Sequence, residues 1–349
     1  MSATVIIALD AMGGDRGPEM VVAGAGLARV RHPEVRFLLF GDEKRMAPIL
    51  RRDAELAKAC EIRHTTEAVG PEDKPSQALR KSRQSSMWLA IDAVDKGQAE
   101  AVVSAGNTGA LMAMAKFVLR TLPGIDRPAI ISFVPTMRGQ TCMLDLGANA
   151  ECDANDLVQF AVMGAAFARI VLGHARPLVG LLNIGVEEAK GNDTVKAAGQ
   201  ILRAGELPME FFGFVEGDGI SAGVVDVIVT DGFTGNVALK TAEGTARLFD
   251  NYLGGAFKRS LFSRLGYLLA RPAIEAFHER VDPRLYDGAM FLGLNGIVVK
   301  SHGGTDETGF ASAIGVAVDM VSENICAKIV VDFEQFGADR GSEAQAAVS

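Results

Sequence analysis

The sequence contains few cysteines and no pairing pattern among them. Its 4 cysteines, Cys60, Cys142, Cys152 and Cys326, form no CxxC pair and no spacing typical of a metal site. A chain of 349 residues can bury a large core without disulfide bonds. We therefore expect free thiols in a reducing compartment.

An excess of basic residues is also lacking. The chain has 35 Lys and Arg against 43 Asp and Glu, a formal net charge of -8. Proteins that bind nucleic acids normally carry a basic balance or a basic stripe, because phosphate contacts dominate their affinity. The charge balance argues against a nucleic-acid partner.

Long uninterrupted apolar runs are absent as well. The best candidate is Leu157–Gly173, but Gln159 and Arg169 interrupt it, and it is shorter than the ~20 residues that a membrane-spanning helix needs. The apolar run Val5–Ala8 is too short for a signal peptide and lacks a basic start. We expect a soluble, cytoplasmic protein in which Leu157–Gly173 is a buried helix.

Several common catalytic motifs are missing. Without a Walker A pattern, ATP hydrolysis at a P-loop is not expected, and without a G-x-S-x-G elbow, serine esterase chemistry is not expected. No cluster of His, Cys or carboxylate residues has metal-ligand spacing. The sequence predicts neither a cofactor nor a metal.

Short apolar runs alternate with longer helical patterns along the whole chain. This alternation predicts an α/β fold with three layers, α/β/α, around a mainly parallel sheet. The predicted strands are Val5–Leu9, Arg36–Phe40, Glu61–Thr65, Ala101–Ser104, Ala129–Val134, Cys142–Leu146, Pro177–Asn183, Glu210–Val215, Val224–Thr230 and Ile297–Lys300. The predicted helices include Glu19–Arg31, Glu43–Ala59, Ser76–Lys96, Asn107–Leu119, Ala154–Leu172 and Thr194–Ala204.

No repeat and no Pro- or Ser-rich linker divides the chain. We predict a single α/β catalytic unit over residues 1–336 and a frayed tail, Gly337–Ser349. Residues 242–280 differ, because their pattern predicts a protruding helical hairpin with Lys258 and Arg259 among apolar residues. Such a hairpin could pack on the domain, form a dimer contact, or touch acidic partners or a membrane surface.

Two glycine-rich loops follow predicted strands in the first third of the chain. Asp10–Asp15 contains Gly13 and Gly14, and Ala105–Ala110 opens directly into an apolar helix. Ligands of open α/β sheets bind outside the carboxyl ends of the strands. Adjacent glycines and a helix start there suit an anion or an oxyanion, although a tight turn or a helix cap explains them too.

Three further strand ends carry polar residues. Ile184–Asn192 brings two carboxylates together with Lys190, a candidate for binding phosphate. Asp231–Asn236 repeats the glycine-rich frame before a helix. His302 lies in a Gly-rich strand end, a position that suits a proton donor or an anion contact. Ordinary surface charges or helix caps are the alternative interpretation of these loops.

Six motifs in register resemble the bacterial phosphate acyltransferases, which form acyl-phosphate from acyl-acyl carrier protein. They extend over nearly the whole chain, from Val5 to the helix after His302. The motifs are DAMGGD at Asp10–Asp15, SAGNTGAL at Ser104–Leu111, DLGAN at Asp145–Asn149, GLLNIGVEEAKG at Gly180–Gly191, FGFVEG at Phe212–Gly217 and DVIVTDGFTGN at Asp226–Asn236.

This resemblance implies properties that composition does not show. The fold should be similar to that of isocitrate and isopropylmalate dehydrogenases, and the protein should form a homodimer. Its substrates should be a long-chain acyl group on acyl carrier protein and inorganic phosphate. The product should pass to a membrane-bound glycerol-3-phosphate acyltransferase. A peripheral contact with the inner face of the membrane is expected.

A direct attack of phosphate on the thioester fits the absence of an obvious nucleophile. The catalytic candidates are Lys190, His302, Asn107 and Asp231. The substrate-binding candidates are Asp10, Gly13, Gly14, Gly106, Thr108, Gly109, Asn183, Glu187, Gly232, Thr234, Gly235 and Asn236. In this hypothesis the Gly106–Gly109 and Asp231–Asn236 loops supply hydrogen-bond donors, Lys190 neutralises phosphate, and His302 protonates the leaving sulfur or orients phosphate.

Acyl carrier proteins are acidic as a family, so a basic patch should dock the donor. Arg80, Lys81 and Arg83 are the first candidates, and Lys258 and Arg259 are the second. Solvated charged faces are the alternative.

One stretch departs from the family pattern. Family members typically carry YGGAPLLG before the last strand, whereas Tyr286–Gly293 reads YDGAMFLG here. Rival functions are a phosphotransacylase that uses acyl-CoA, a metal- and NAD-dependent decarboxylating dehydrogenase, and a non-catalytic scaffold for lipid enzymes.

Overall fold

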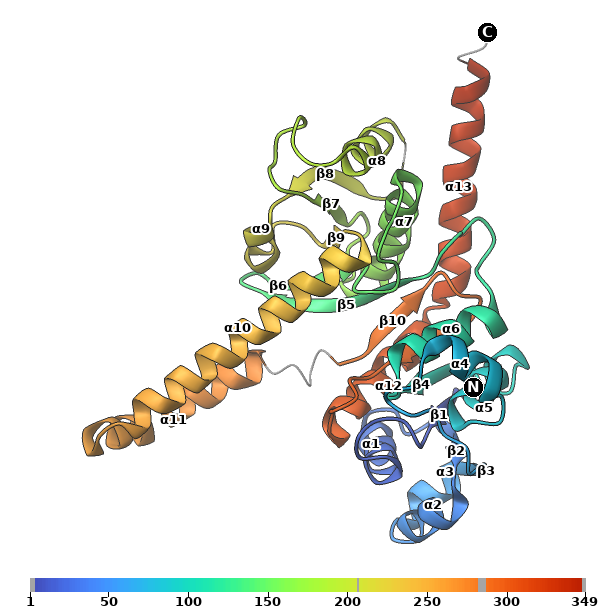
Figure 1. Ribbon diagram of the computed structural model, residues 1–349, viewed down its shortest axis with the longest axis vertical. Helices are drawn as coiled ribbons and strands as arrows, with labels where there is room; N and C mark the ends of the chain where they lie inside the picture. Colours follow the sequence, from blue (N-terminus) through green and yellow to red (C-terminus); the bar gives the residue numbers. More distant parts are fainter. Residues whose placement is uncertain (1–3, 206, 282–286, 347–349) are drawn as a thin grey trace.

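The strands form one large sheet at the centre of the molecule. A computed structural model describes residues 4–205, 207–281 and 287–346. Within these ranges the sheet has 11 strands in the order β3-β2-β1-β4-β11-β10-β5-β6-β9-β7-β8 (Figure 1). The strands are β1 Ile6–Asp10, β2 Arg36–Gly41, β3 Cys60–His64, β4 Ala101–Ser104, β5 Ala129–Thr136, β6 Gly139–Leu144, β7 Leu178–Leu182, β8 Glu210–Val215, β9 Val227–Val229, β10 Ala289–Leu292 and β11 Ile297–Lys300.

The sheet consists of two parallel blocks. Strands β3, β2, β1, β4 and β11 are parallel to one another, and so are β6, β9, β7 and β8. Between the blocks, β10 is antiparallel to β11 and to β5, and β5 is antiparallel to β6. The two blocks therefore run in opposite directions, and their carboxyl ends leave the sheet at opposite edges. The predicted α/β fold with a mainly parallel sheet is confirmed.

Helices cover both faces of the sheet, as the sequence predicts. The helices are α1 Pro18–Arg31, α2 Glu43–Leu50, α3 Ala54–Ala59, α4 Pro75–Lys81, α5 Ser86–Asp95, α6 Thr108–Leu119, α7 Ala154–Val171, α8 Asp193–Ala204, α9 Gly217–Ala222, α10 Gly232–Lys258, α11 Leu261–Val281, α12 Glu307–Ser322 and α13 Ile325–Ala346. Alternate residues of β1 point to different cores, because a strand has a period of two. Ile7 and Leu9 belong to the core cluster that includes buried residues of α1 and α12, whereas Ala8 belongs to the cluster that includes buried residues of α5 and α6.

Helix α7 contains the candidate membrane span. It is long and apolar enough to cross a membrane, but 72% of that window is buried inside the protein. Its polar interruptions are accounted for inside the fold: Gln159 donates to the carboxylate of Asp126 at 2.7 Å, and Arg169 forms an ion pair with Asp332 of α13. The predicted buried helix is confirmed.

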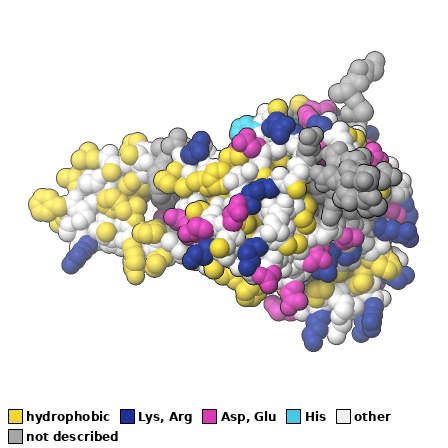
Figure 2. All heavy atoms as spheres, turned by 90° about the horizontal axis from the view of Figure 1, so that it is seen from above, with side chains coloured by type: hydrophobic (Ala, Val, Ile, Leu, Met, Phe, Trp, Pro, Cys, Tyr) yellow, Lys and Arg dark blue, Asp and Glu magenta, His cyan; other side chains and the backbone are white. Residues whose placement is uncertain are grey.

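Helices α10 and α11 follow one another over the region predicted as a hairpin, and they contact each other. They extend away from the sheet and carry many exposed apolar side chains (Figures 1 and 2). Phe257 and Tyr267 pack together, with ring centroids 5.2 Å apart. Helix α13 continues to Ala346, into the segment predicted as a frayed tail, and residues 347–349 lie outside the described residues.

Candidate active site

A buried carboxylate, Asp10, ends β1 at the carboxyl edge of the first block. It is 1% exposed and accepts hydrogen bonds from Ser86 Oγ at 2.6 Å and Ser104 Oγ at 2.7 Å. Burial raises the pKa of Asp10, and the two hydroxyl groups act against this rise. Asp10 therefore fixes the end of β1 to the end of β4 and to the start of α5.

The glycine loops after β1, β4 and β11 interlock around this carboxylate. A Cβ atom on Gly13 would lie 2.7 Å from both Asp10 Oδ2 and the Gly106 nitrogen, so only glycine fits there. The N–H of Asp15 donates to the carbonyl of Gly303 at 2.9 Å. The structure thus brings Asp10, Gly13, Gly14 and Gly106 together with the His302 loop.

His302 has an exposed side chain whose orientation is set by its own loop. Its Nδ1 accepts the N–H of Gly304 at 3.2 Å, so the neutral ring carries its proton on Nε2. Its backbone N–H donates to Asp287 Oδ1 at 2.9 Å, and Ser301 Oγ donates to Asp287 Oδ2 at 2.9 Å. Asp287 belongs to the stretch that departs from the family pattern; Tyr286 of that stretch lies outside the described residues.

Lys300, the last residue of β11, is a buried cation beside these carboxylates. It is 8% exposed, and its ammonium donates to the carbonyl of Ser301. Burial lowers the pKa of Lys300 to about 8, against the attraction of Asp287, Asp10 and Asp15. Its location and charge indicate that Lys300 balances the carboxylates under the glycine loops.

Asn107 acts as the N-cap of α6. Its Oδ1 accepts the N–H of Ala110 at 3.0 Å, and its Nδ2 donates to the carbonyls of Pro71 at 2.8 Å and Asp73 at 3.0 Å. Both ends of this side chain are therefore engaged in the fold. The backbone of this loop remains the available donor for an oxyanion, and Thr108 and Gly109 next to it are exposed.

A second polar group lies at the carboxyl edge of the other block, where Asp145 follows β6. Asp145 accepts N–H bonds from Ile130 at 3.0 Å, Gly147 at 3.1 Å, Ala148 at 2.9 Å and Asn149 at 2.7 Å. This carboxylate shapes the loop after β6. The shaped loop in turn supports the loop after β9.

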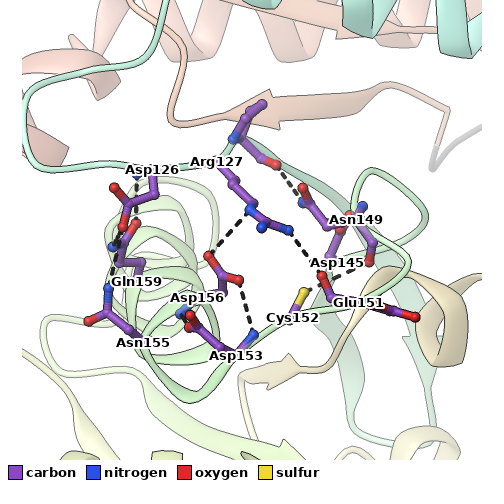
Figure 3. Close-up of polar contacts among 11 residues, drawn as sticks. Asp126, Arg127, Asp145, Asn149, Glu151, Cys152, Asp153, Asn155, Asp156 and Gln159 are labelled. Carbon is purple, nitrogen blue, oxygen red and sulfur yellow. Dashed lines mark hydrogen bonds and ion pairs between the residues drawn. The ribbon is translucent and has the colours of Figure 1, made fainter.

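An arginine fixes the far side of the same loop. Arg127 donates to the carbonyl of Glu151 at 3.1 Å and lies 3.8 Å from Asp156 Oδ1 (Figure 3). Asp156 also accepts the N–H of Asp153 at 3.0 Å, completing a capping box at the start of α7. The loop is thereby fastened to a helix of the core.

The loop after β9 packs on Asp145. The N–H of Gly232 donates to the carbonyl of Asn149 at 2.7 Å, and a Cβ atom on Gly235 would lie 1.9 Å from the carbonyl oxygen of Asp145. Asp231 caps α10 by accepting the N–H and the hydroxyl of Thr234, at 2.8 and 2.7 Å. Asn236 donates to the carbonyl of Leu146 at 3.1 Å.

Lys190 lies after β7, the strand adjacent to β9, and its side chain is exposed. Asn183 Nδ2 donates to the carbonyls of Gly185 at 3.1 Å and Lys190 at 3.2 Å and so shapes this loop, and Glu187 is exposed on it. Within the described ranges no salt bridge engages the ammonium of Lys190. It is free to meet an anion.

The four predicted catalytic residues thus fall into two pairs. Asn107 and His302 belong to the first block, and Lys190 and Asp231 belong to the second. A groove of about 1100 Å³ touches loops of both blocks, but Asn107, Lys190, Asp231 and His302 are not among its lining residues. It is lined by Thr108 and Gly109 after β4 and by Gly147, Ala148 and Asn236 from the second block.

The predicted docking residues lie on two separate surfaces. Arg80 and Lys81 form the last turn of α4, and Lys258 and Arg259 are at the end of α10. The Arg83 guanidinium lies over the rings of Trp88 and Phe117, at 5.5 and 5.8 Å from their centroids. Arg83 is therefore positioned by cation–π contacts beside the groove.

Five polar supports of these loops were not predicted as site residues: Ser86, Ser104, Asp145 and Lys300, which are buried, and Asp287, which is half-buried. All but Ser86, which begins α5, adjoin a glycine loop or the end of an apolar strand. A charged residue that ends an apolar strand is a signal that could have identified Lys300. Among the residues described, no group of three His, Cys, Asp or Glu side chains is arranged to hold a metal ion.

Solved structures with a similar fold come from phosphotransacetylases and phosphotransacylases. The fold is similar to that of a phosphotransacetylase from Streptococcus pyogenes, with a TM-score of 0.64 and 16% identity over 93% of this chain and 95% of that one. A branched-chain phosphotransacylase from Enterococcus faecalis V583 gives a TM-score of 0.55 and 14% identity over 91% of this chain and 99% of that one. At these identities the likeness shows the fold alone.

Sequence comparison then gives the family. The model of a family described as "Fatty acid synthesis protein" matches residues 5–328, and the chain belongs to this family. The chain is 61% identical to a phosphate acyltransferase from Rhodospirillum rubrum over 93% of both chains. It is 58% identical to one from Paramagnetospirillum magneticum over 99% of both chains. The predicted resemblance to phosphate acyltransferases is confirmed, and the chain is an enzyme.

Proposed function

We propose that this enzyme transfers a long-chain fatty acyl group from acyl carrier protein to inorganic phosphate, giving acyl-phosphate for the acylation of glycerol-3-phosphate. The observation that carries the proposal is the identity of about 60% with phosphate acyltransferases over nearly the full chain. The exposed Lys190 and the glycine loops around the groove support it, because they suit an anion and an oxyanion.

The reaction needs no covalent enzyme intermediate. An oxygen of hydrogen phosphate attacks the thioester carbonyl carbon, a tetrahedral oxyanion forms, and the carbon–sulfur bond breaks. The proton of hydrogen phosphate ends on the departing sulfur, so the products are acyl-phosphate and the free thiol. The enzyme has to position the two anionic reactants and stabilise the oxyanion.

Each group of loops has a role in this scheme. Lys190 neutralises phosphate, and backbone N–H groups of the Gly106–Gly109 and Asp231–Asn236 loops donate to phosphate and to the oxyanion. His302 donates a hydrogen bond from Nε2 and orients a reactant. Its Nδ1 already accepts the Gly304 N–H, and this favours an orienting role over transfer of a proton to sulfur.

The carrier protein docks on Arg80, Lys81 and Arg83. The exposed side chains of Arg80 and Lys81 and the positioned guanidinium of Arg83 support this surface. Lys258 and Arg259 form the alternative surface. Charge reversal at Arg80 and Lys81 should raise the KM for acyl carrier protein and weaken its dependence on salt, whereas reversal at Lys258 and Arg259 should not.

The chain acts as one catalytic unit with an architecture like that of isocitrate and isopropylmalate dehydrogenases. It works as a cytoplasmic homodimer that touches the inner face of the membrane through the end of the α10–α11 pair. Leu261, Phe262 and Leu269 support this contact, because they are 80%, 88% and 78% exposed. A membrane-bound glycerol-3-phosphate acyltransferase would receive the product there.

The test is formation of acyl-phosphate from palmitoyl-acyl carrier protein and phosphate, without metal or nucleotide, beside palmitoyl-CoA and acetyl-CoA. Phosphate-dependent turnover of the carrier-protein donor is expected. Lys190→Ala should raise the KM for phosphate at least tenfold, whereas Lys196→Ala, which removes a lysine paired with Asp193 at 3.0 Å, should leave it unchanged. Turnover of acetyl-CoA alone would refute the proposal.

A further inference from the structure

The groove between the two blocks follows one face of helix α6. Most of its lining residues on this helix recur at intervals of three and four, which places them on a single side. They are Thr108, Gly109, Met112, Ala113, Lys116 and Phe117, and Val118 also lines the groove beside them. The 12 residues of α6 extend over about 18 Å, and lining residues occur from its first turn to its last, so the groove is long.

Apolar side chains form much of the groove wall. Leu79 of α4, Trp88 of α5, Ile130 of β5 and Leu146 of the loop after β6 also line it. Phe117 is 55% exposed there, although its ring lies 5.9 Å from that of Trp88. An aromatic side chain left open in a cavity favours an apolar occupant, because its burial would remove apolar surface from water.

The charged lining residues lie toward solvent. Asp95, Lys116 and Arg120 are exposed, and Asp92 is paired with Lys96 at 2.5 Å. Arg83 stands over Trp88 and Phe117 and adds a positioned cation beside the apolar wall. This distribution suits an occupant with a long apolar body and an acidic carrier outside.

The groove reaches the Gly106–Gly109 loop, one of the two loops proposed to donate to phosphate and to the oxyanion of the thioester. Thr108 and Gly109, which line it, directly follow Asn107 and open α6. An acyl chain whose thioester carbon lies at this loop can extend along the apolar face of α6.

We propose that the groove along α6 holds the acyl chain of the donor, and that Ala113 and Phe117 determine the chain length that the enzyme prefers. The proposal rests on the proposed function. Each methylene group that enters the groove should raise kcat/KM about fourfold until the groove is filled. The ratio of kcat/KM for long-chain donors to that for short-chain donors should therefore depend on the side chains at positions 113 and 117.

The test compares kcat/KM for palmitoyl- and butyryl-acyl carrier protein. Ala113→Trp fills the half-buried wall of the groove and should lower the palmitoyl-to-butyryl ratio at least tenfold, with the butyryl rate within about twofold of wild type. Phe117→Ala removes apolar wall and should lower the same ratio by a smaller factor. Val30→Trp, which adds the same side chain at an 81% exposed position of α1, is the matched control.

Thermal unfolding of each variant separates a folding defect from an effect on the groove, and Phe117→Ala tests the groove without adding volume. A ratio unchanged in both Ala113→Trp and Phe117→Ala, in enzymes that still form acyl-phosphate, would overturn the groove assignment and leave the function intact. The same holds if Ala113→Trp changes only the molecular mass in solution, since the groove would then be an interface between copies. No turnover of any donor by the wild type would refute the function itself.

Discussion

The backbone N–H of His302 and the hydroxyl of Ser301 both donate to one carboxylate, that of Asp287, at 2.9 Å. Asp287 precedes β10 and His302 follows β11. These bonds therefore hold the start of β10 to the end of β11, which lie side by side in this antiparallel pair. Burial raises the pKa of Asp287. Hydrogen bonds from the Thr305 side chain, the His302 backbone and the Ser301 side chain act against this rise, and so does the charge of Lys300. The arrangement is a support for the His302 loop.

Asp287→Ala should therefore destabilise the protein by about 2–4 kcal/mol, because it leaves the donors of Ser301 and His302 without this acceptor and removes one of the carboxylates near Lys300. Asp287→Asn should cost less, since its amide oxygen can still accept one bond. Urea unfolding measures both. The double variant with Lys300→Met should lose less than the sum of the single variants; strict additivity would show that the two groups do not interact.

His302 is expected to work as a hydrogen-bond donor. His302→Ala should lower kcat/KM for phosphate about 10²-fold, whereas His302→Gln, which retains an N–H donor, should recover part of this loss. Steady-state kinetics at several pH values provide the measurement. If the glutamine variant is as impaired as the alanine variant and a pH limb disappears in both, His302 transfers a proton instead.

Lys300 should make stability depend on pH in the alkaline range. Its pKa is about 8 in the folded protein against 10.5 for an ordinary lysine, so the unfolded chain binds a proton between these values that the folded protein has released. Raising the pH from 7 to 10.5 should therefore stabilise the wild type relative to Lys300→Met, by about 2–3 kcal/mol. Unfolding free energies of both proteins across this range give the difference. A constant difference would mean that Lys300 titrates like an exposed lysine.

The sequence predicted the layered fold because apolar runs of strand length alternate with helical patterns. It failed where local capping divides a helix. The predicted helix Glu43–Ala59 is two helices, since Asp53 accepts the N–H groups of Glu55 and Leu56 and starts a new one. Ser85 likewise divides Ser76–Lys96 by capping α5. The short strand β10 was missed because it follows the loop-like Asp287 and Gly288.

The opposite directions of the two blocks were not anticipated either. The connection between β5 and β6 is too short for the crossover that parallel strands need, so this pair had to be antiparallel. Because of that reversal, Lys190 and Asp231 follow strands that run in the opposite direction to the strands before Asn107 and His302. They also belong to the other block of the sheet. Strand-end loops could be found from residue type, whereas buried supports such as Asp145 depend on contacts between distant segments.

The ion pair between Arg169 of α7 and Asp332 of α13 should contribute to stability and not to catalysis. Their side chains are 19% and 10% exposed, and Arg169 also donates to the carbonyl of Pro208 at 2.8 Å. Asp332→Ala should destabilise the protein by about 3 kcal/mol, because it leaves a poorly solvated guanidinium unpaired. Glu323→Ala removes the exposed partner of Lys328 and should cost less than about 1 kcal/mol. Unfolding curves measure the loss of stability in each variant, and the activity per folded molecule shows whether catalysis changes. Equal losses of stability in Asp332→Ala and Glu323→Ala would contradict a larger contribution from the Arg169–Asp332 pair.

Gly235 and Gly244 allow the importance of the loop after β9 to be tested within one helix. Both lie in α10, but a Cβ atom on Gly235 would meet the carbonyl oxygen of Asp145 at 1.9 Å, whereas one on Gly244 would meet nothing within 4 Å. Gly235→Ala should therefore displace the start of α10 from the Asp145 loop and lower kcat/KM by more than tenfold. Gly244→Ala should leave activity unchanged and stabilise the helix by about 0.5–1 kcal/mol. Kinetics together with thermal unfolding resolve the two effects. If Gly235→Ala kept wild-type kinetics, the close contact between this loop and Asp145 would have no part in holding the site.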